Sequence, residues 1–202
     1  MIFSDFFSAL HKTKGVKKVA RRNLVNVAER ILLETVKTAA EESIEKTPSK
    51  KIAEKCDITD ATIFVYYKTK KNLFNKAYEY SLEKLYANFK SNANLLQEGK
   101  YKDFWEEILS FALDNDYYAK FCAAYRHSAY KEKTNPYVSA EFIKDYFNAE
   151  LTRNLTDEQC FSLLDTVFSI FLETVIAFAD KKVDKNKKTL DAFFNVCVGA
   201  FL

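Results

Sequence analysis

Residues 52–74 read IAEKCDITDATIFVYYKTKKNLF, and this stretch decides the fold. It predicts two short helices that a tight turn joins, followed by a polar and aromatic run rich in lysine. Asp57 falls in the turn, where a left-handed backbone is needed and Asp is tolerated better than most residues. Thr59 is the expected N-cap of the second helix. Two helices at this spacing are typical of a helix-turn-helix, in which one helix enters the DNA major groove and the other braces it.

The residues around this pair extend the helical pattern in both directions. Upstream, apolar residues recur at helical spacing over about residues 23–42. Thr47 before Pro48 predicts a helix start, with Thr47 as N-cap and Pro48 at the first helical position. Downstream, a further helix is expected to begin near Lys70. The sequence therefore predicts one helix before the pair, beginning near residue 23, and one helix after it, beginning near Lys70.

Composition favours long helices over the whole chain. Of 202 residues 48% are hydrophobic and 15% aromatic, while only 3 Gly and 2 Pro occur. A β-sandwich or barrel needs many turns built from Gly and Pro, so the predicted fold class is all-α. Further helices are expected over about residues 1–13, 71–91, 101–113, 116–131, 139–153, 157–182 and 189–202, the sixth with a capping box that starts at Thr156.

Charge is divided unevenly along the chain. Residues 1–76 hold 16 Lys/Arg and 9 Asp/Glu, a formal charge of +7, and residues 77–202 hold 15 and 19, a charge of −4. A basic N-terminal part suits a DNA-facing domain, although chance clustering gives the same split. The basic run within residues 1–22 is either an arm that contacts phosphates or the minor groove, or a solvated tail.

Cysteine usage and the N-terminus indicate a cytoplasmic protein. Cys56, Cys122, Cys160 and Cys197 form no C-x-x-C pair and are expected to be free buried thiols. The N-terminus is apolar and then basic, the reverse of a secretory signal. The longest apolar stretch, residues 161–179, is interrupted by Asp165 and Glu173, so no membrane partner is expected.

Residues for catalysis are not found. The two histidines, His11 and His127, lack a Glu or Asp three or four positions before them, and no phosphate-binding or dinucleotide glycine pattern occurs. The chain is therefore not expected to be an enzyme, and no cofactor, metal or catalytic residue is predicted.

Residues 31–74 resemble the DNA-binding end of the tetracycline-repressor (TetR) family of bacterial transcriptional regulators. The residues in register with the family pattern are Ile31-Leu32, Thr47, Ile52-Ala53, Ile58-Thr59, Thr62-Ile63-Phe64, Tyr66-Tyr67, Lys70 and Leu73. The family often has Gly where this chain has Ser43, Asp57 and Ala61. It commonly has Tyr at Phe64, and Lys, Arg or a neutral residue at Asp60. These departures bear on phosphate contacts and specificity and leave the helix pattern intact.

The resemblance implies two domains. Residues 1–74 would form the basic arm and the helix-turn-helix, and residues 75–202 a helical body that binds a ligand and forms a homodimer. The DNA-binding residues it implies are Thr47, Thr59, Asp60, Ala61, Thr62, Phe64, Tyr66 and Lys70.

Within this set the side chains would have different roles. Thr59 would cap its helix and donate to a phosphate, and Lys70 and Thr47 would each hold a phosphate. Thr62 can offer a hydroxyl to a base and a methyl to thymine, and Asp60 either accepts from cytosine N4 or points to solvent. Ala61 allows a close approach to DNA.

For the body, the resemblance implies an effector cavity and a two-fold interface on a palindromic operator. The candidate ligand-pocket residues are Trp105, Phe121, Tyr125, Arg126, His127 and Tyr146. The candidate dimer-interface residues are Phe161, Leu164, Phe168, Phe171, Phe193 and Val196. The aromatic lining favours an apolar or aromatic effector, and Arg126 can pair with an anionic one. Ordinary core packing also explains both sets, and a regulator that a protein partner controls would share the same sequence features.

Overall fold

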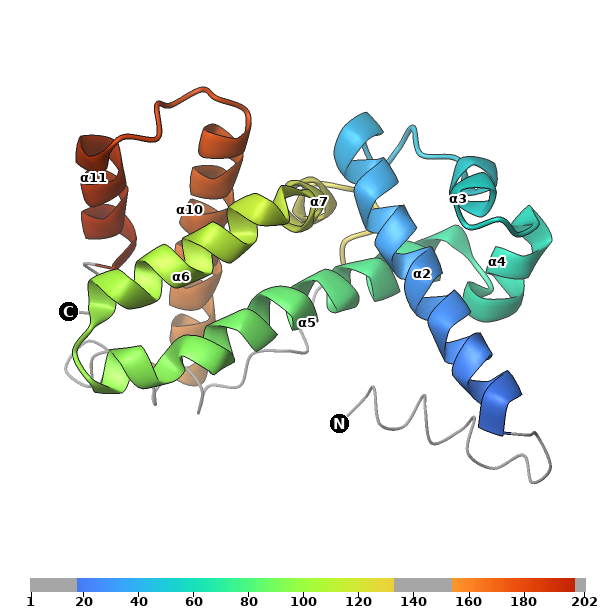
Figure 1. Ribbon diagram of the computed structural model, residues 1–202, viewed down its shortest axis with the longest axis horizontal. Helices are drawn as coiled ribbons and strands as arrows, with labels where there is room; N and C mark the ends of the chain where they lie inside the picture. The colour runs from blue at the N-terminus through green and yellow to red at the C-terminus, as the bar shows by residue number, and fades with distance from the viewer. Residues whose placement is uncertain (1–17, 133–153, 199–202) are drawn as a thin grey trace.

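Residues 18–132 and 154–198 are described by the computed structural model, and all regular structure in these two ranges is α-helical (Figure 1). The all-α prediction is therefore confirmed. The helices are α2 (Lys18–Glu42), α3 (Ser49–Lys55), α4 (Asp60–Tyr67), α5 (Lys70–Gln97), α6 (Tyr101–Asp114), α7 (Asp116–Arg126), α10 (Asp157–Ala179) and α11 (Lys187–Val198). The helices expected over residues 1–13 and 139–153 lie outside the described residues.

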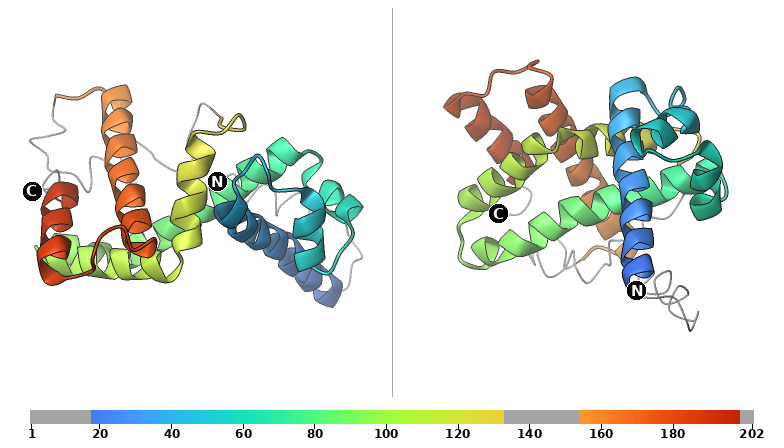
Figure 2. Two further views of the ribbon diagram at one scale, coloured as in Figure 1. Left: turned by 90° about the horizontal axis from the view of Figure 1, so that it is seen from above. Right: turned by 45° about the vertical axis from the view of Figure 1, so that its right-hand side comes forward.

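The helices form a head and a body that α5 joins. The head consists of α2, α3, α4 and the first turns of α5, and the body of the rest of α5 with α6, α7, α10 and α11 (Figures 1 and 2). Leu73 and Phe74 of α5 are fully buried in the head, and Leu82 and Leu85 are buried further along the same helix. One continuous cluster of buried residues runs through both parts, because α5 contributes to each. The predicted boundary at residue 74 falls inside α5, and the division of roles stays a prediction.

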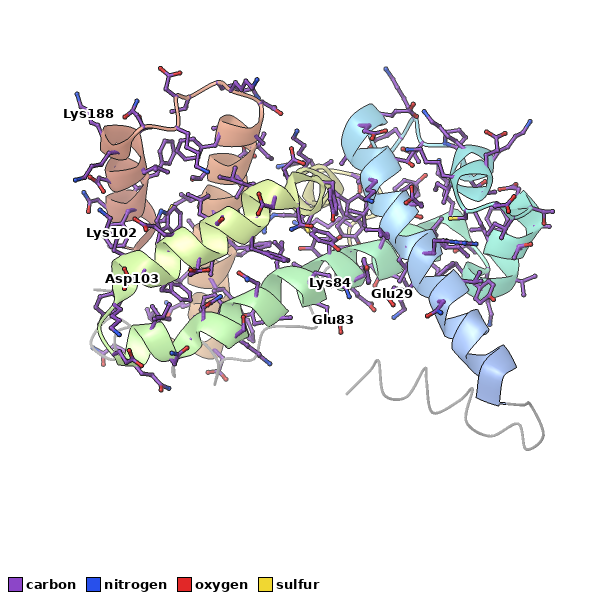
Figure 3. The ribbon with its side chains drawn as sticks, viewed as in Figure 1. Glu29, Glu83, Lys84, Lys102, Asp103 and Lys188 are labelled. Carbon is purple, nitrogen blue, oxygen red and sulfur yellow. The ribbon has the colours of Figure 1, made fainter. Side chains whose placement is uncertain are left out.

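Ion pairs tie neighbouring helices together at the surface. Lys84 Nζ of α5 lies 3.0 Å from Glu29 Oε1 of α2, and Lys102 Nζ of α6 lies 2.7 Å from Asp191 Oδ1 of α11 (Figure 3). Exposed pairs of this kind contribute little to stability, because solvent screens both charges. They indicate helix register, while burial of apolar side chains provides the larger part of the stabilisation.

Helices α5 and α7 end five or more residues from the ends that the sequence predicts, and α10 ends at Ala179 instead of near residue 182. Helix α5 was expected to end near residue 91 but continues to Gln97, where Gly99 with φ 70° stops it. Ala93 is 6% exposed, so burial of this last section outweighs the weak helix propensity of the asparagines around it. Helix α7 was expected to reach residue 131 but ends at Arg126, because the Ser128 hydroxyl bonds to Tyr125 O and turns the chain.

The long C-terminal helix α10 begins with the predicted capping box. Thr156 Oγ1 accepts from Gln159 N at 3.3 Å, and Gln159 Oε1 accepts from Thr156 N at 2.9 Å. By length and composition this one helix of the described chain could cross a membrane, with 22% of the apolar window buried inside the fold. Core helices of water-soluble proteins pass the same test. Helix α10 buries Leu172, Val175 and Phe178 inside the fold, which accounts for part of its apolar character.

The tight turn between α3 and α4 adopts the predicted left-handed backbone. Asp57 has φ 51°, and Ser43 after α2 has φ 89°. These are two of the positions where the family often has Gly. Arg30 of α2 holds the turn in place, because Arg30 Nη2 donates to Cys56 O at 2.6 Å. The turn angle between the two helices therefore depends on a strained residue and on one long-range hydrogen bond.

We predict that the stability of Asp57 variants depends on how readily the new residue adopts a positive φ. The free energy of unfolding of Asp57→Gly is expected to differ from that of the parent by about 1 kcal/mol at most, because Gly adopts positive φ freely. Asp57→Val is expected to lose about 2 kcal/mol or more, because a β-branched residue is strongly disfavoured there. Urea denaturation of both variants measures the difference. Equal stability of the Gly and Val variants would show that the turn is not held in the left-handed conformation.

Candidate nucleic-acid interface

The buried side of α4 fixes its orientation on the head. Ile63 is fully buried and Tyr67 is 4% exposed, as expected for core residues. The Tyr67 hydroxyl donates to Ala28 O of α2 at 2.8 Å, which joins the end of α4 to the long helix behind it. Burial raises the pKa of the Tyr67 hydroxyl and of the Cys56 thiol, so both groups stay neutral at physiological pH.

Thr59 caps α4 as predicted. Its side-chain oxygen accepts from Thr62 N at 3.3 Å, and the two hydroxyl oxygens, Thr59 Oγ1 and Thr62 Oγ1, lie 2.8 Å apart. The cap lowers the cost of starting a helix of only eight residues. Because the hydroxyls bond to each other, each keeps only part of its hydrogen-bonding capacity for another partner.

Thr47 has a different position from the one the sequence predicts. Helix α3 begins at Ser49 with Pro48 as N-cap, so the predicted cap at Thr47 is wrong by one residue. Thr47 is fully buried, and its hydroxyl donates to Ser43 O at 2.6 Å. Its hydroxyl satisfies the carbonyl that the left-handed turn at Ser43 leaves free. The side chain therefore stabilises the connection between α2 and α3 from inside and does not lie on the surface.

The outer side of α4 is largely apolar. Ala61 is exposed, and Val65 is 78% exposed, the highest value among the exposed large apolar side chains of the described chain. Val65 is not among the DNA-binding residues that the family resemblance predicts. Phe64 and Tyr66 are half-buried on either side of this strip.

Asp60 lies at the first position of α4 and is half-buried. Its Oδ1 atom is inaccessible to solvent and has no hydrogen-bond partner within residues 18–132 and 154–198. A carboxylate at a helix N-terminus interacts favourably with the helix dipole, which partly offsets this desolvation.

Lysines surround the two short helices. Seven lysines and three acidic residues lie within residues 46–71, a formal charge of +4. Lys51 and Lys55 form ion pairs with Glu42 and Glu41 of α2. Lys70 begins α5 next to its N-cap Thr69, and its Nζ lies 5.5 Å above the Phe74 ring. A basic surface of this kind attracts a polyanion irrespective of sequence.

The body contains a cavity of about 100 Å³ between α5, α6, α10 and α11. Its lining residues are Leu85, Tyr86, Asn88, Phe89, Phe104, Trp105, Ile108, Phe111, Leu164, Val167, Phe168, Phe171 and Cys197. None of these side chains carries a charge. Trp105 is the one predicted pocket residue among them, and three predicted dimer residues, Leu164, Phe168 and Phe171, also line the cavity.

The other predicted pocket residues lie elsewhere or outside the described chain. Phe121 and Tyr125 are buried against α5, where the Phe121 ring packs on Phe74 at 6.4 Å and the Tyr125 ring on Tyr78 at 4.2 Å. His127 is the exposed C-cap of α7. Tyr146 lies outside the described residues. Phe121 and Tyr125 therefore pack α7 on α5, and neither they nor His127 are among the residues that line the cavity.

Arg126 at the end of α7 is held by α10. Its Nη2 lies 2.6 Å from Asp165 Oδ2 and donates to Ser169 Oγ at 2.7 Å, and its guanidinium lies 5.8 Å from the centre of the Phe168 ring. The predicted use of Arg126 for an anionic ligand thus competes with an ion pair inside the protein.

Two of the predicted dimer residues are strongly exposed. Val196 of α11 is 63% exposed and Phe161 of α10 is 40% exposed, and Phe193 is half-buried against Phe178 at 5.2 Å. Phe161 and Val196 lie on the two helices that the sequence assigns to self-association. Their exposure leaves apolar area available for a partner.

Comparisons with known proteins agree with this geometry. Residues 31–77 match the family model described as bacterial regulatory proteins, tetR family. A search of curated proteins found no significant match. A solved TetR-family transcription regulator from Marinobacter aquaeolei VT8 shares 19% identity at a TM-score of 0.60, over 89% of this chain and 97% of that one.

Two further solved structures are similar over nearly their whole length. A protein from Shewanella sp. PV-4 assigned to the same family has 16% identity and a TM-score of 0.61, over 86% of this chain and 97% of that one. A TetR-family regulator from Haemophilus influenzae Rd has 16% identity and a TM-score of 0.51, over 88% and 97%.

At these identities the structural neighbours establish the fold, and the matched segment establishes the head. TetR-family regulators bind DNA and are not enzymes. Residues 31–77 therefore match the DNA-binding part of the TetR family of transcription regulators, and the described helices share the fold of solved members of that family.

Proposed function

We propose that the protein is a cytoplasmic, homodimeric repressor that binds a palindromic operator and is released by a small, largely apolar molecule. The observation that carries this proposal is the exposed face of α4, which is anchored from behind and surrounded by lysines. A rigid helix that presents side chains outward from a basic surface is what major-groove reading requires.

Phosphate contacts are assigned to Lys70 and Thr59 in this proposal. Lys70 starts α5 directly after α4, so its ammonium group lies beside the reading helix. Thr59 is exposed at the N-terminus of α4, where backbone N–H groups and a hydroxyl favour an anion. Ala61, Thr62 and Tyr66 are assigned to the groove, and Thr47 is left out because it is buried.

Self-association is assigned to the outer faces of α10 and α11. Helix α10 has mostly apolar residues but is largely unburied within the described fold. Packing the two helices on their two-fold copies would cover Phe161 and Val196 in a four-helix interface. A dimer is needed because one helix pair reads too few base pairs for useful specificity.

The effector is assigned to the cavity between α5, α6, α10 and α11. An engineered apolar cavity of about 150 Å³ accommodates benzene, so the space of about 100 Å³ suits a ligand of ring size or one that widens it slightly. Trp105 is 3% exposed and its indole Nε1 has no hydrogen-bond partner in the described part of the chain. A neutral aromatic molecule with one acceptor group would satisfy this N–H.

The small volume of this cavity also favours a second candidate function. A space this small suits a DNA-binding regulator that a protein partner, and not a small molecule, controls. Screening the full-length protein on its bound DNA separates the two, since small molecules alone release only the ligand-responsive form.

For phosphate contact we predict a change in salt dependence. Lys70→Gln combined with Thr62→Ala is expected to weaken operator binding and to reduce the slope of log affinity against log salt by about 0.9 per subunit, since one phosphate contact is lost. Lys90→Gln, at an exposed site near the far end of α5, is the matched control and keeps the parent slope. Unchanged affinity and slope in the double variant would remove Lys70 and Thr62 from the interface.

For the dimer we predict dissociation by a single buried charge. Val196→Asp and Phe161→Asp should each give a monomer at micromolar concentration in sedimentation velocity, because an unpaired carboxylate is costly in an apolar interface. Ala87→Asp, at an exposed position of α5, should leave the dimer intact. A parent protein that already sediments as a monomer contradicts the proposed interface.

For the effector we predict that the Trp105 indole N–H favours ligands that carry a hydrogen-bond acceptor. Acetophenone and its hydrocarbon counterpart ethylbenzene are both expected to raise the melting temperature of the parent protein. In Trp105→Phe the affinity for acetophenone should fall about two- to tenfold, while that for ethylbenzene stays nearly the same, because only the ketone uses the indole N–H. Equal losses for both probes, or equal binding of benzoate, would rule out this assignment.

A further inference from the structure

We infer that Val65, together with Ala61, reads the C5-methyl group of thymine in each operator half-site. This inference rests on the proposed function, since it concerns how the same helix would select its DNA. Val65 is 78% exposed and Ala61 is also exposed, one helical turn apart on α4. Residues four apart lie on the same face of a helix, so the two form a short apolar strip.

The strip lies on the side of α4 that faces away from the protein. Ile63 and Tyr67 are the buried pair of this helix, and each is two positions after a member of the strip. Two residues correspond to about 200° of rotation around a helix axis, so the strip and the anchor lie on opposite sides. Figure 1 shows α4 at the outer, right-hand edge of the head, with α2 and the start of α5 on its inner side. Val65 therefore has no packing role within the described fold.

Only one base presents a matching group in the major groove. Thymine carries a methyl group there, whereas guanine, adenine and cytosine present acceptors and amino donors. A valine placed against those groups would remove water from them without replacing a hydrogen bond, which is unfavourable. The neighbouring hydroxyls of Thr59 and Thr62 are bonded to each other, and Asp60 is half-buried. The centre of the reading face is thus apolar, and its selectivity comes from methyl contact.

The charges around the strip favour DNA over an apolar protein surface as its partner. Residues 46–71 carry a formal charge of +4, which the ion pairs of Lys51 and Lys55 with α2 reduce. Lys68 and Lys71, which flank α4 on the C-terminal side, are exposed. An apolar strip framed by positive charge matches the thymine methyl groups of a groove bordered by phosphates. A hydrophobic docking site for a protein would instead leave these lysines to be desolvated without partners.

The test uses the full-length protein and duplexes selected from random sequence. Each thymine of the bound consensus is replaced in turn by deoxyuridine, which removes only the methyl group. Replacing one critical thymine in a single half-site is expected to lower the affinity about fourfold. Replacing the equivalent thymine in both half-sites is expected to lower it about fifteenfold. A 5-methylcytosine·guanine pair at that position is expected to bind more tightly than the unmethylated pair.

The variant Val65→Ala tests whether Val65 makes the contact. It is expected to bind the thymine duplex about as weakly as the parent binds the deoxyuridine duplex, and to lose the distinction between the two. Alanine at this exposed site removes no core packing and favours the helix, so folding is retained. A parent protein that binds deoxyuridine duplexes as tightly as thymine duplexes overturns the inference. So does a Val65→Ala variant that still distinguishes them. If no duplex is enriched at all, DNA binding itself fails and the inference fails with it, which is a separate and recognisable result.

Discussion

Burial along a single unbroken helix is the constraint on which the rest of this structure depends. Helix α5 has 28 residues, about 42 Å at 1.5 Å per residue. Its first turns bury Leu73 and Phe74 in the head, and its later turns bury Leu85 beside the cavity. Because no hinge interrupts it, the start of α5 at Lys70 cannot move without changing how the same helix packs in the body. Helix α5 therefore offers one route for coupling between the cavity and the DNA-facing surface, beside the packing of α7 on α2.

The buried side chain of Asn75 lies where head and body meet along α5. Asn75 is 8% exposed, and its Oδ1 accepts from the Tyr125 hydroxyl of α7 at 2.8 Å. The Tyr125 ring also stacks on Tyr78 one turn along α5. Sliding α7 along α5 would break this hydrogen bond in a low-dielectric environment, where an unpaired group is costly. The network therefore favours one register of the two helices over intermediate ones.

Features of the fold that depend on neighbouring residues were predictable from the sequence. The caps at Thr59 and Thr156, the left-handed turn at Asp57 and the start of α5 at Lys70 each follow from side chains within four positions. Features that depend on distant partners were not. The sequence gives no indication that Ala93 is buried in a continued α5, or that Arg30 of α2 donates to Cys56 O. Val65 was missed for a related reason, since exposure of an apolar residue is decided by how its helix is anchored.

The prediction that Arg126 binds an anionic ligand also failed to account for distant partners. The contacts of Arg126 affect which ligands the cavity can bind. A cation among aromatic residues suggests an anion-binding site when only the sequence is known. In the fold, Asp165 and Ser169 of α10 already satisfy part of its guanidinium. The Nη1 atom of Arg126 is buried and has no hydrogen-bond partner in the described part of the chain, but an anion bound there would share the guanidinium with Asp165 and gain less from it. The cavity itself has no charged lining, which makes a charged ligand costly to desolvate there. The ion pair therefore serves to hold α7, which packs against α2 of the head, to α10, which carries one of the exposed apolar faces. Because Arg126 is used for this structural contact, the ligand would be selected by the shape of the cavity and by the indole N–H of Trp105.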